Sequence, residues 1–167
     1  MFLCSLAQAL GITHSLMTHP AGSPTESEHL VAIYHRYGRE GEDRDFWAYD
    51  RVGEIVQGSD SARAWELVIA LVRTADDDRL DYVGAGPVED LVNRHGSTLV
   101  DSIVAEARRD SRFRQALASI WLVQEDVQPE VLRRLRDATH GQILVATQAE
   151  IDAANPKVDR KPLDRDA

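Results

Sequence analysis

Glu89, Asp90 and His95 are the residues whose types and spacing come closest to a catalytic set. Carboxylates and an imidazole in one cleft can act as general acid and base, which would suit a hydrolytic or small-molecule enzyme. His95 follows Glu89 by six residues, a spacing that does not place two side chains on one face of a helix. An enzyme that uses these three residues is therefore kept as an alternative function, and no catalytic residue is predicted.

The same carboxylates fit the start of a helix. In the string GAGPVEDL, Pro87 suits the first helical position, and Glu89 then falls at the third. There its carboxylate can bond back to the N–H of Gly86, as in half of a capping box, and acids at this end also favour the helix dipole. We predict that Glu89 caps its own helix. A contact of Glu89 and Asp90 with a cationic partner is the next interpretation.

Other catalytic and metal-binding chemistries find little support in the sequence. The six histidines are His14, His19, His29, His35, His95 and His140. None of them forms the i, i+4 pair that is typical of a helical zinc site. There is no G-x-S-x-G elbow, no Walker loop and no complete G-x-G-x-x-G sequence, and the single cysteine, Cys4, has no designated base. We therefore predict neither a metal nor a cofactor.

Trp47 and Tyr49 are the aromatic residues that best fit a binding surface. They lie two residues apart and cannot both face inward on one helix, so one is expected at the surface beside acidic neighbours. Exposed aromatic side chains are typical anchors of protein interfaces. Together with Glu89, Asp90 and His95 they form the predicted partner-binding set. The other large aromatics are expected mostly in the core: Phe46, Trp65, Tyr82, Phe113 and Trp121.

The charge balance narrows the class of partner. The 167 residues carry 28 acids and 19 bases, a formal charge of -9, and residues 26–126 alone hold 21 acids against 12 bases. An acidic body argues against nucleic acid, because binding there depends on neutralised phosphates. Two arginine clusters, within 108–114 and 133–136, lack interleaved aromatics and are expected to be solvated or ion-paired. A basic protein is the partner that such a charge attracts.

Hydrophobic periodicity near 3.6 residues predicts an all-α fold. The expected helices cover residues 26–37, 44–57, 62–74, 87–94, 97–109, 111–123 and 128–138, and a further one begins at 76–78. Gly38, Gly58 and Gly96 are expected to end three of them. The apolar run at 143–146 is too short to assign. These helices are expected to stack as antiparallel hairpins.

A shift of 36 residues places part of the hydrophobic pattern on itself. It aligns Ile55 with Leu91 and, further on, Leu67 with Ile103. Repeats near this length occur in TPR-like and HEAT-like solenoids of helix pairs. Two units of this length are expected, and a true repeat and a merely shared amphipathic pattern are both left open.

The two ends of the chain differ from its middle. Residues 1–25 contain no charged side chain and are interpreted as a disordered leader or as a start-site artefact upstream of Met17; a signal peptide is the lesser alternative because a positive n-region is missing. Residues 26–140 are expected to form one helical domain, and residues 141–167 a C-terminal extension that is mobile from about 155. No apolar run reaches the roughly 20 residues of a membrane span, and a cytoplasmic location is expected.

Several spaced motifs together resemble one uncharacterised bacterial family, a domain of unknown function. The motifs are Phe46-Trp47-Ala48, Ala64-Trp65-Glu66-Leu67, the segment from Gly84 to Leu91, His95-Gly96, the segment from Arg112 to Leu117, and Trp121. The resemblance covers about residues 30–122. It implies a small helical bacterial protein and supplies no activity and no catalytic residues.

From these observations we expect a non-enzymatic bacterial protein-binding module. Its most concrete form is an immunity or antitoxin-like protein that neutralises a basic partner, such as a nuclease toxin. The alternatives are an enzyme that uses Glu89, Asp90 and His95, and a regulatory helical scaffold that uses the C-terminal extension. The sequence does not indicate the oligomeric state.

Overall fold

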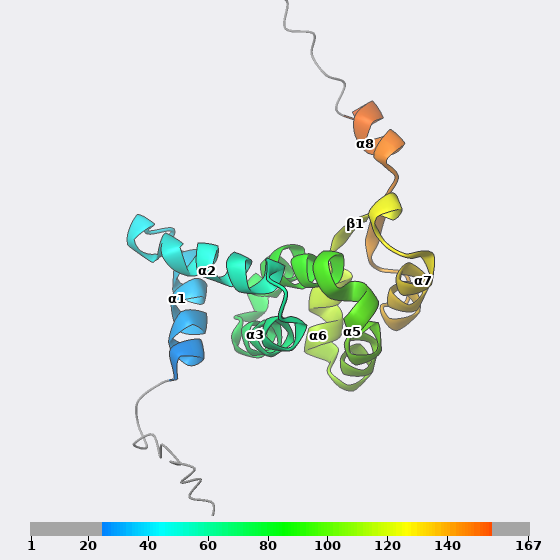
Figure 1. Cartoon of the computed structure of the whole chain (residues 1–167). Coiled ribbons are helices and arrows are strands. Elements are labelled where there is room, and N and C mark those ends of the chain that lie inside the picture. Colours follow the sequence, from blue (N-terminus) through cyan, green and yellow to red (C-terminus); the bar gives the residue numbers. More distant parts are fainter. Residues whose placement is uncertain (1–24, 155–167) are drawn as a thin grey trace, which may run out of the picture.

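The computed structural model of the chain describes residues 25–154. These residues form an all-α fold with one small two-stranded sheet (Figure 1). None of the helices in this range is long and apolar enough to cross a membrane. The predictions for the leader up to residue 24, for the start site and for the tail beyond residue 154 lie outside the described residues.

Helix α1 (Glu26–Glu40) begins at a complete capping box. Thr25 Oγ1 accepts a hydrogen bond from the Glu28 N–H at 3.2 Å, and the Glu28 carboxylate accepts one from the Thr25 N–H at 2.6 Å. The helix continues past the predicted stop at Gly38 and ends at Gly41, whose φ of 67° is left-handed. Gly38 instead lies within the helix, where the Arg79 guanidinium packs against it.

Helices α2 (Phe46–Gln57) and α3 (Ser61–Thr74) follow as a helical hairpin. A 3-10 turn, η1 (Asp43–Asp45), precedes α2, so the helix begins two residues later than predicted. It ends before Gly58, as predicted. Asp60 then caps α3, because its carboxylate accepts a hydrogen bond from the Arg63 N–H at 3.0 Å.

A helical stretch runs without a break from residue 80 to residue 109. After the 3-10 turn η2 (Asp77–Arg79), it comprises α4 (Leu80–Val83), the π-helical turn η3 (Gly84–Val88) and α5 (Glu89–Arg109). The predicted helices 87–94 and 97–109 are therefore one helix, and the predicted stop at Gly96 is wrong. Pro87 has no N–H to donate, and it lies within the wider π turn instead of starting a new helix.

The glycines of this stretch serve helix packing. A Cβ on Gly84 would lie 2.3 Å from the carbonyl oxygen of Ala116, so only glycine lets the π turn approach the next helix this closely. Gly96 is buried, and a Cβ there would lie 3.5 Å from Val131 Cγ1. Gly96 thus lies inside α5 against α7, at a position where a Cβ would make an ordinary van der Waals contact.

The C-terminal part contains the sheet. α6 (Ser111–Ala118) leads to strand β1 (Trp121–Val123), which pairs in parallel with β2 (Leu144–Ala146). Between the strands lie the 3-10 turn η4 (Gln124–Asp126) and α7 (Pro129–Ala138), and α8 (Gln148–Ala154) follows β2. The prediction of a helix over 111–123 is therefore wrong beyond Ala118. The helix predicted over residues 128–138 is confirmed by α7.

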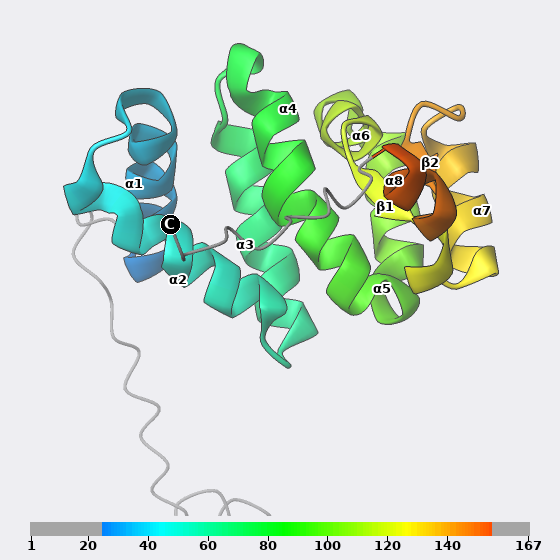
Figure 2. The same ribbon diagram turned by 90° about the horizontal axis from the view of Figure 1, so that it is seen from above.

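The helices pack along one direction. α1 and α2 lie at one end, α3 and the α4–α5 stretch in the middle, and α6 and α7 at the other end (Figure 2). One hydrophobic core runs through them, and its largest fully buried side chains include Leu71, Leu91, Ile103, Phe113, Leu117 and Leu135. The core thus joins the helix pairs into one unit.

The 36-residue pattern does not correspond to two equivalent hairpins. The shift aligns α2 and α3, which a turn separates, with the uninterrupted stretch from α4 to α5. The aligned residues share an apolar face because both segments are amphipathic helices. The two segments differ in backbone course, because the chain turns between α2 and α3 and does not turn between α4 and α5. The all-α prediction is confirmed, whereas the repeat is not seen as a repeated hairpin.

Candidate functional site

Glu89 does not cap its own helix. Its carboxylate accepts a hydrogen bond from the backbone N–H of Trp121 at 2.7 Å, and no side-chain cap is present at the start of α5. Because the helical turns continue from η3 into α5, the N–H groups at this point already have partners within the helix. Burial raises the pKa of Glu89, and the hydrogen bond from Trp121 opposes that rise.

Asp90 links α5 to the end of α2. Its carboxylate accepts a hydrogen bond from Gln57 Nε2 at 2.9 Å. Burial raises the pKa of Asp90, and the Gln57 hydrogen bond only partly offsets this. Among the described residues, no arginine forms an ion pair with Asp90. In the described part of the chain, Asp90 is thus a half-buried carboxylate whose hydrogen-bond partner is a neutral amide.

His95 has a structural role. It is buried, and its Nε2 donates a hydrogen bond to the backbone carbonyl oxygen of Val56 at 3.0 Å. The direction follows from chemistry, because a carbonyl oxygen can only accept. This bond provides the Val56 carbonyl, near the C-terminal end of α2, with a partner from α5.

The structure therefore does not bring Glu89, Asp90 and His95 together as an acid–base set. Asp90 and His95 both hold the end of α2, whereas Glu89 holds the start of β1. General acid–base catalysis needs side chains that converge on one reacting group. In addition, the described residues contain no group of three or more His, Cys, Asp or Glu side chains arranged to hold a metal ion.

An exposed aromatic surface lies on α2 instead. Phe46, Trp47 and Tyr49 are 43%, 46% and 42% exposed, and we call them the α2 aromatic surface. One of Trp47 and Tyr49 was expected at the surface, and both are partly exposed. Tyr49 stacks on Phe46 at 5.9 Å between ring centroids and on Tyr34 at 6.1 Å.

The expectation that most other large aromatics lie in the core is wrong for several of them. Tyr82 is 44% exposed and Trp121 is 51% exposed, whereas Phe113 is buried. Trp121 lies in a strand at the surface, where helical periodicity does not apply. It pairs with Leu144, which is also exposed.

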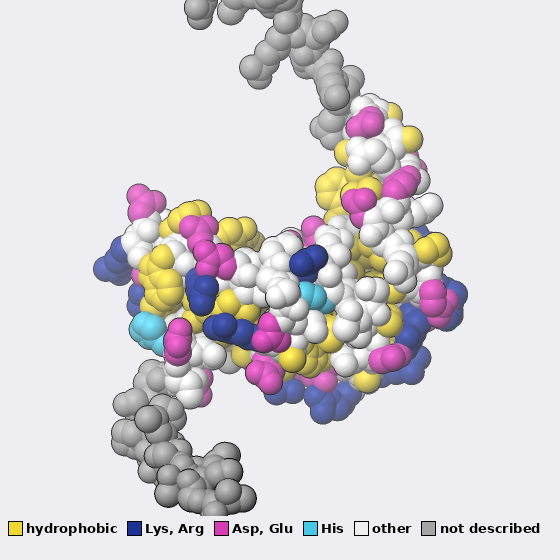
Figure 3. All heavy atoms as spheres, in the orientation of Figure 1, with side chains coloured by type: hydrophobic (Ala, Val, Ile, Leu, Met, Phe, Trp, Pro, Cys, Tyr) yellow, Lys and Arg dark blue, Asp and Glu magenta, His cyan; other side chains and the backbone are white. Residues whose placement is uncertain are grey.

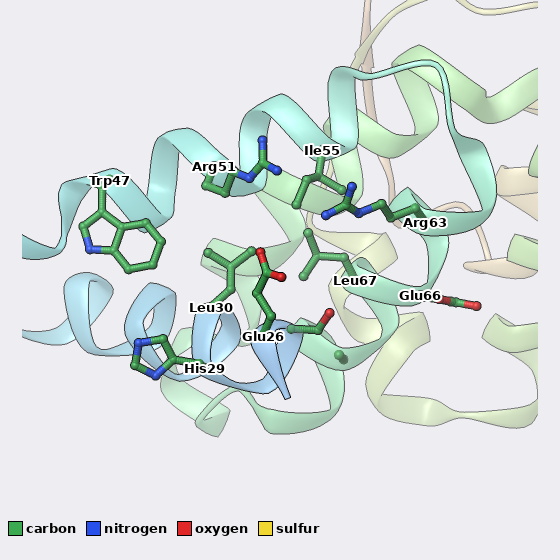
Figure 4. Close-up of a pocket in the computed structure, with 11 residues that line it drawn as sticks. Glu26, His29, Leu30, Trp47, Arg51, Ile55, Arg63, Glu66 and Leu67 are labelled. Atoms are coloured by element: carbon green, nitrogen blue, oxygen red, sulfur yellow. The ribbon is translucent and has the colours of Figure 1, made fainter. Parts of the chain in front are cut away.

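Trp47 lies at the rim of a groove between the first three helices. The groove has a volume of about 450 Å³ and is open to solvent; we call it the Trp47 groove. Leu30, Ile55 and Leu67 contribute its apolar surface, one from each helix (Figure 4). Its polar lining residues are Glu26, Ser27, His29, Arg51, Arg63 and Glu66.

The groove contains residues that sequence reasoning did not select. Arg63 and Glu66 lie three residues apart on α3, beside its apolar stripe, and Arg51 is on α2. In a sequence, polar residues beside the apolar stripes of two consecutive helices can indicate the rim of a groove between those helices. That signal is weak, because it also fits ordinary solvated faces. Figure 3 shows apolar side chains interspersed with acidic and basic ones at the α1–α2 end.

The arginine clusters are engaged in ion pairs. Arg134 pairs with Asp101 at 2.6 Å, and Arg133 pairs with both Glu130 and Asp137. In the earlier cluster, Arg109 pairs with Glu106 and Arg112 with Asp77. These four arginines form ion pairs, which fits the expectation that the clusters are solvated or ion-paired.

Comparison with known proteins places the chain in a family. No curated protein and no solved structure matches it. One family model, described as a family of unknown function (DUF6869), matches residues 35–143. The match spans the C-terminal part of α1 and all of α2 to α7, and it includes the α2 aromatic surface and the α4–α5 stretch. The chain therefore belongs to this family of unknown function, DUF6869.

Proposed function

We propose that the protein is a non-enzymatic protein-binding module whose α2 aromatic surface and Trp47 groove contact a basic protein partner. One observation carries the proposal: Trp47 is 46% exposed at the rim of an open groove of about 450 Å³ with an apolar floor. Exposed tryptophan beside a concave apolar surface is the arrangement in which interface residues contribute most to affinity. A groove of this volume accepts one or two side chains of a partner.

The use of the candidate catalytic residues in packing also supports a binding role. Glu89, Asp90 and His95 each make a hydrogen bond that joins two elements of the fold. A module that only binds needs a rigid scaffold behind its contact surface, and these bonds supply part of it.

The charge of the described residues suits a basic partner. Residues 25–154 contain 25 acidic and 15 basic side chains, a difference of -10. Such an excess accelerates association with a cationic protein and makes the rate sensitive to salt. The most specific form of the proposal is an immunity or antitoxin-like protein in the bacterial cytoplasm that neutralises a basic toxin, such as a nuclease.

A capture experiment with matched variants tests the proposal. The tagged protein, Trp47→Ala and Trp121→Ala are each used to capture proteins from the native host at low and at high salt. Trp121 is similarly exposed and lies at the opposite end of the fold, so its variant controls for nonspecific adhesion of an aromatic surface. We expect one basic protein to be captured by the wild type and by Trp121→Ala, to be lost with Trp47→Ala, and to be recovered less at high salt.

Two results would overturn the proposal. The first is recovery of no protein partner at either salt concentration. The second is equal capture by the wild type and Trp47→Ala, because the α2 surface would then not be the contact. For the immunity form, the captured protein should inhibit growth when expressed alone and should cease to do so when the wild-type chain is co-expressed.

A further inference from the structure

The Trp47 groove lies beside the N-terminal end of α1. Glu26, the first residue of this helix, is one of its lining residues. In Figure 4 the Glu26 side chain lies between those of Leu30 and Leu67, which belong to the apolar surface of the groove. Thr25 joins α1 to residues 1–24. The part of the chain that precedes α1 is therefore attached directly at the groove.

The groove suits an occupant that is apolar and uncharged. Its acidic lining residues are Glu26 and Glu66 and its basic ones are Arg51 and Arg63, so their formal charges, -2 and +2, cancel. Arg51 is already paired with Glu54 at 2.7 Å. A charged side chain placed on the apolar floor would lose its hydration without a surplus of opposite charge to replace it. An aliphatic side chain has no such cost and is stabilised by burial.

The segment before α1 has these properties. Residues 1–25 contain no Asp, Glu, Lys or Arg, although 28% of the whole chain is charged. Leu3, Leu6 and Leu10 recur at intervals of three and four residues, which is the spacing of an apolar stripe on an amphipathic helix. Gln8 falls away from that stripe. An amphipathic helix that lays its apolar face into a groove is a recurrent mode of recognition.

The position of this segment in the sequence brings it within reach of the groove. Fourteen residues lie between Leu10 and Thr25. When fully extended, that many residues span roughly 45 Å. Pro20, Gly22 and Pro24 lie in this linker, and residues of these types favour turns. Linking a segment to its binding site gives it an effective concentration that is about millimolar for short linkers, so that even weak contacts populate the bound state.

We propose that the segment Leu3–Leu10 of the same chain, which we call the Leu6 segment, binds in the Trp47 groove with its leucine side chains on the apolar floor. The segment and the protein partner then compete for one site, and the partner must displace the segment to bind. If the segment fills the groove in about 90% of molecules, the apparent affinity for the partner is about tenfold lower. This regulation rests on the proposed function, because it requires that the partner uses the same groove.

The only cysteine of the chain provides a direct test. By helical periodicity Cys4 falls away from the leucine stripe, so a nitroxide label on it does not replace a leucine contact. The label is attached to the full 15N-labelled chain, and the broadening of amide signals is measured by NMR before and after chemical reduction of the nitroxide. We expect broadening at Ile55 and Leu67, which line the groove, and none at Leu135 in α7, at the opposite end of the fold (Figure 2).

Paired variants make the test specific. Leu6→Asp places a charge on the stripe and should lower the ratio of bound to free segment at least about tenfold. Gln8→Asp adds the same charge off the stripe and should leave the broadening unchanged. Trp47→Ala removes part of the rim and should reduce the broadening at the groove. Tyr49→Ala is its control, because Tyr49 is similarly exposed on α2 and is not among the lining residues of the groove.

Three results would overturn the binding of the Leu6 segment. The first is the absence of broadening at the groove in the wild type. The second is equal broadening in the wild type and in Leu6→Asp, because the leucine stripe would then not make the contact. The third is broadening of the same size in a mixture of nitroxide-labelled chain without 15N and 15N-labelled Cys4→Ser chain, since the segment would then bind the groove of a second copy.

The failure of this inference and the failure of the proposed function can be told apart. If the groove signals do not broaden but a partner is still captured through Trp47, the binding of the Leu6 segment is wrong and the binding module stands. If they broaden but no partner is captured, the proposed protein-binding function is wrong. With both in place, Leu6→Asp should capture more partner than the wild type and Gln8→Asp should not; equal capture by Leu6→Asp and the wild type would overturn the competition.

Discussion

The Glu89 carboxylate of α5 accepts a hydrogen bond from the backbone N–H of Trp121, the first residue of β1, at 2.7 Å. This contact ties the sheet to the middle of the fold across 32 residues of sequence. Hydrogen bonds to a charged acceptor contribute more to stability than neutral ones, so the loss of this acceptor should destabilise the fold.

We expect Glu89→Ala to lower the free energy of unfolding by about 1–3 kcal/mol. Glu89→Gln should lower the free energy of unfolding less, because the amide oxygen of glutamine can still accept the hydrogen bond. Urea unfolding measures both, with Glu66→Ala as the control, since Glu66 is a partly exposed carboxylate on α3. Equal loss in the alanine and glutamine variants would show that the acceptor at this position is not what stabilises the strand.

Gly84 and Gly53 should respond oppositely to the same substitution. Gly84→Ala places a Cβ 2.3 Å from the Ala116 carbonyl oxygen, so helix α6 must move, and we expect a loss of about 3 kcal/mol or more. Gly53→Ala meets nothing within 4 Å and should raise the unfolding free energy by about 0.5–1 kcal/mol. Thermal and urea unfolding of the two variants check this. Destabilisation by Gly53→Ala would mean that its neighbourhood is filled.

Tyr34→Phe should stabilise the isolated protein. The Oη atom is buried without a partner in the described residues, so its removal relieves the desolvation penalty of the hydroxyl group while the ring remains. We expect a gain of about 1 kcal/mol in unfolding free energy. Tyr37→Phe is the matched control. A loss of stability in Tyr34→Phe, measured by urea unfolding, would show that the hydroxyl group has a partner in the free protein.

The ion pair of Arg36 with Asp45 should make stability depend on acid pH. Asp45 is 2% exposed and accepts two hydrogen bonds from Arg36, at 2.5 and 2.6 Å. The hydrogen bonds from Arg36 lower the pKa of Asp45 in the folded protein. A carboxyl group whose pKa is lowered by folding stabilises above its unfolded pKa, near 3.9, and this stabilisation is lost as the pH falls from there through the folded pKa.

Asp45→Asn should therefore destabilise the protein at pH 7 and flatten the loss of stability below pH 4. Asp43→Asn, in the same 3-10 turn, has no such ion pair among the described residues and serves as the control. Urea midpoints measured at several pH values provide the comparison. If Asp45→Asn loses as much stability at acid pH as the wild type, Asp45 does not cause the pH dependence of stability.

The sequence was sufficient to place the helices that have conventional boundaries. Asp60 and Gly58 bound α3 and α2 as their types predict, and Pro129 begins α7. Gly38 and Gly96 were misinterpreted because glycine both ends helices and permits close packing, and only tertiary contacts separate these roles. Arg79 packs on the first and Val131 on the second, and both come from distant positions in the chain.

The candidate site was harder to predict than the fold. The spacing of Trp47 and Tyr49 correctly indicates a surface, but it does not show that α3 completes a groove beside Trp47. The role of Glu89 was wrong because the π turn at Pro87 makes the preceding segment helical, so there is no free helix start to cap. A π turn depends on the packing of Gly84 against α6, which local sequence does not reveal.

The parallel pairing of β1 with β2 sets an order of events during folding. Parallel strands cannot be joined by a tight turn, and here α7 is the crossover that must dock before residues 121 and 144 can meet. α1 to α6 all precede this crossover, so a growing chain can assemble their core first. The sheet closes last and rests on three residue pairs. Its amide hydrogens should therefore exchange with solvent faster than those of α3 and α5, because local opening of the crossover does not require the helical core to unfold.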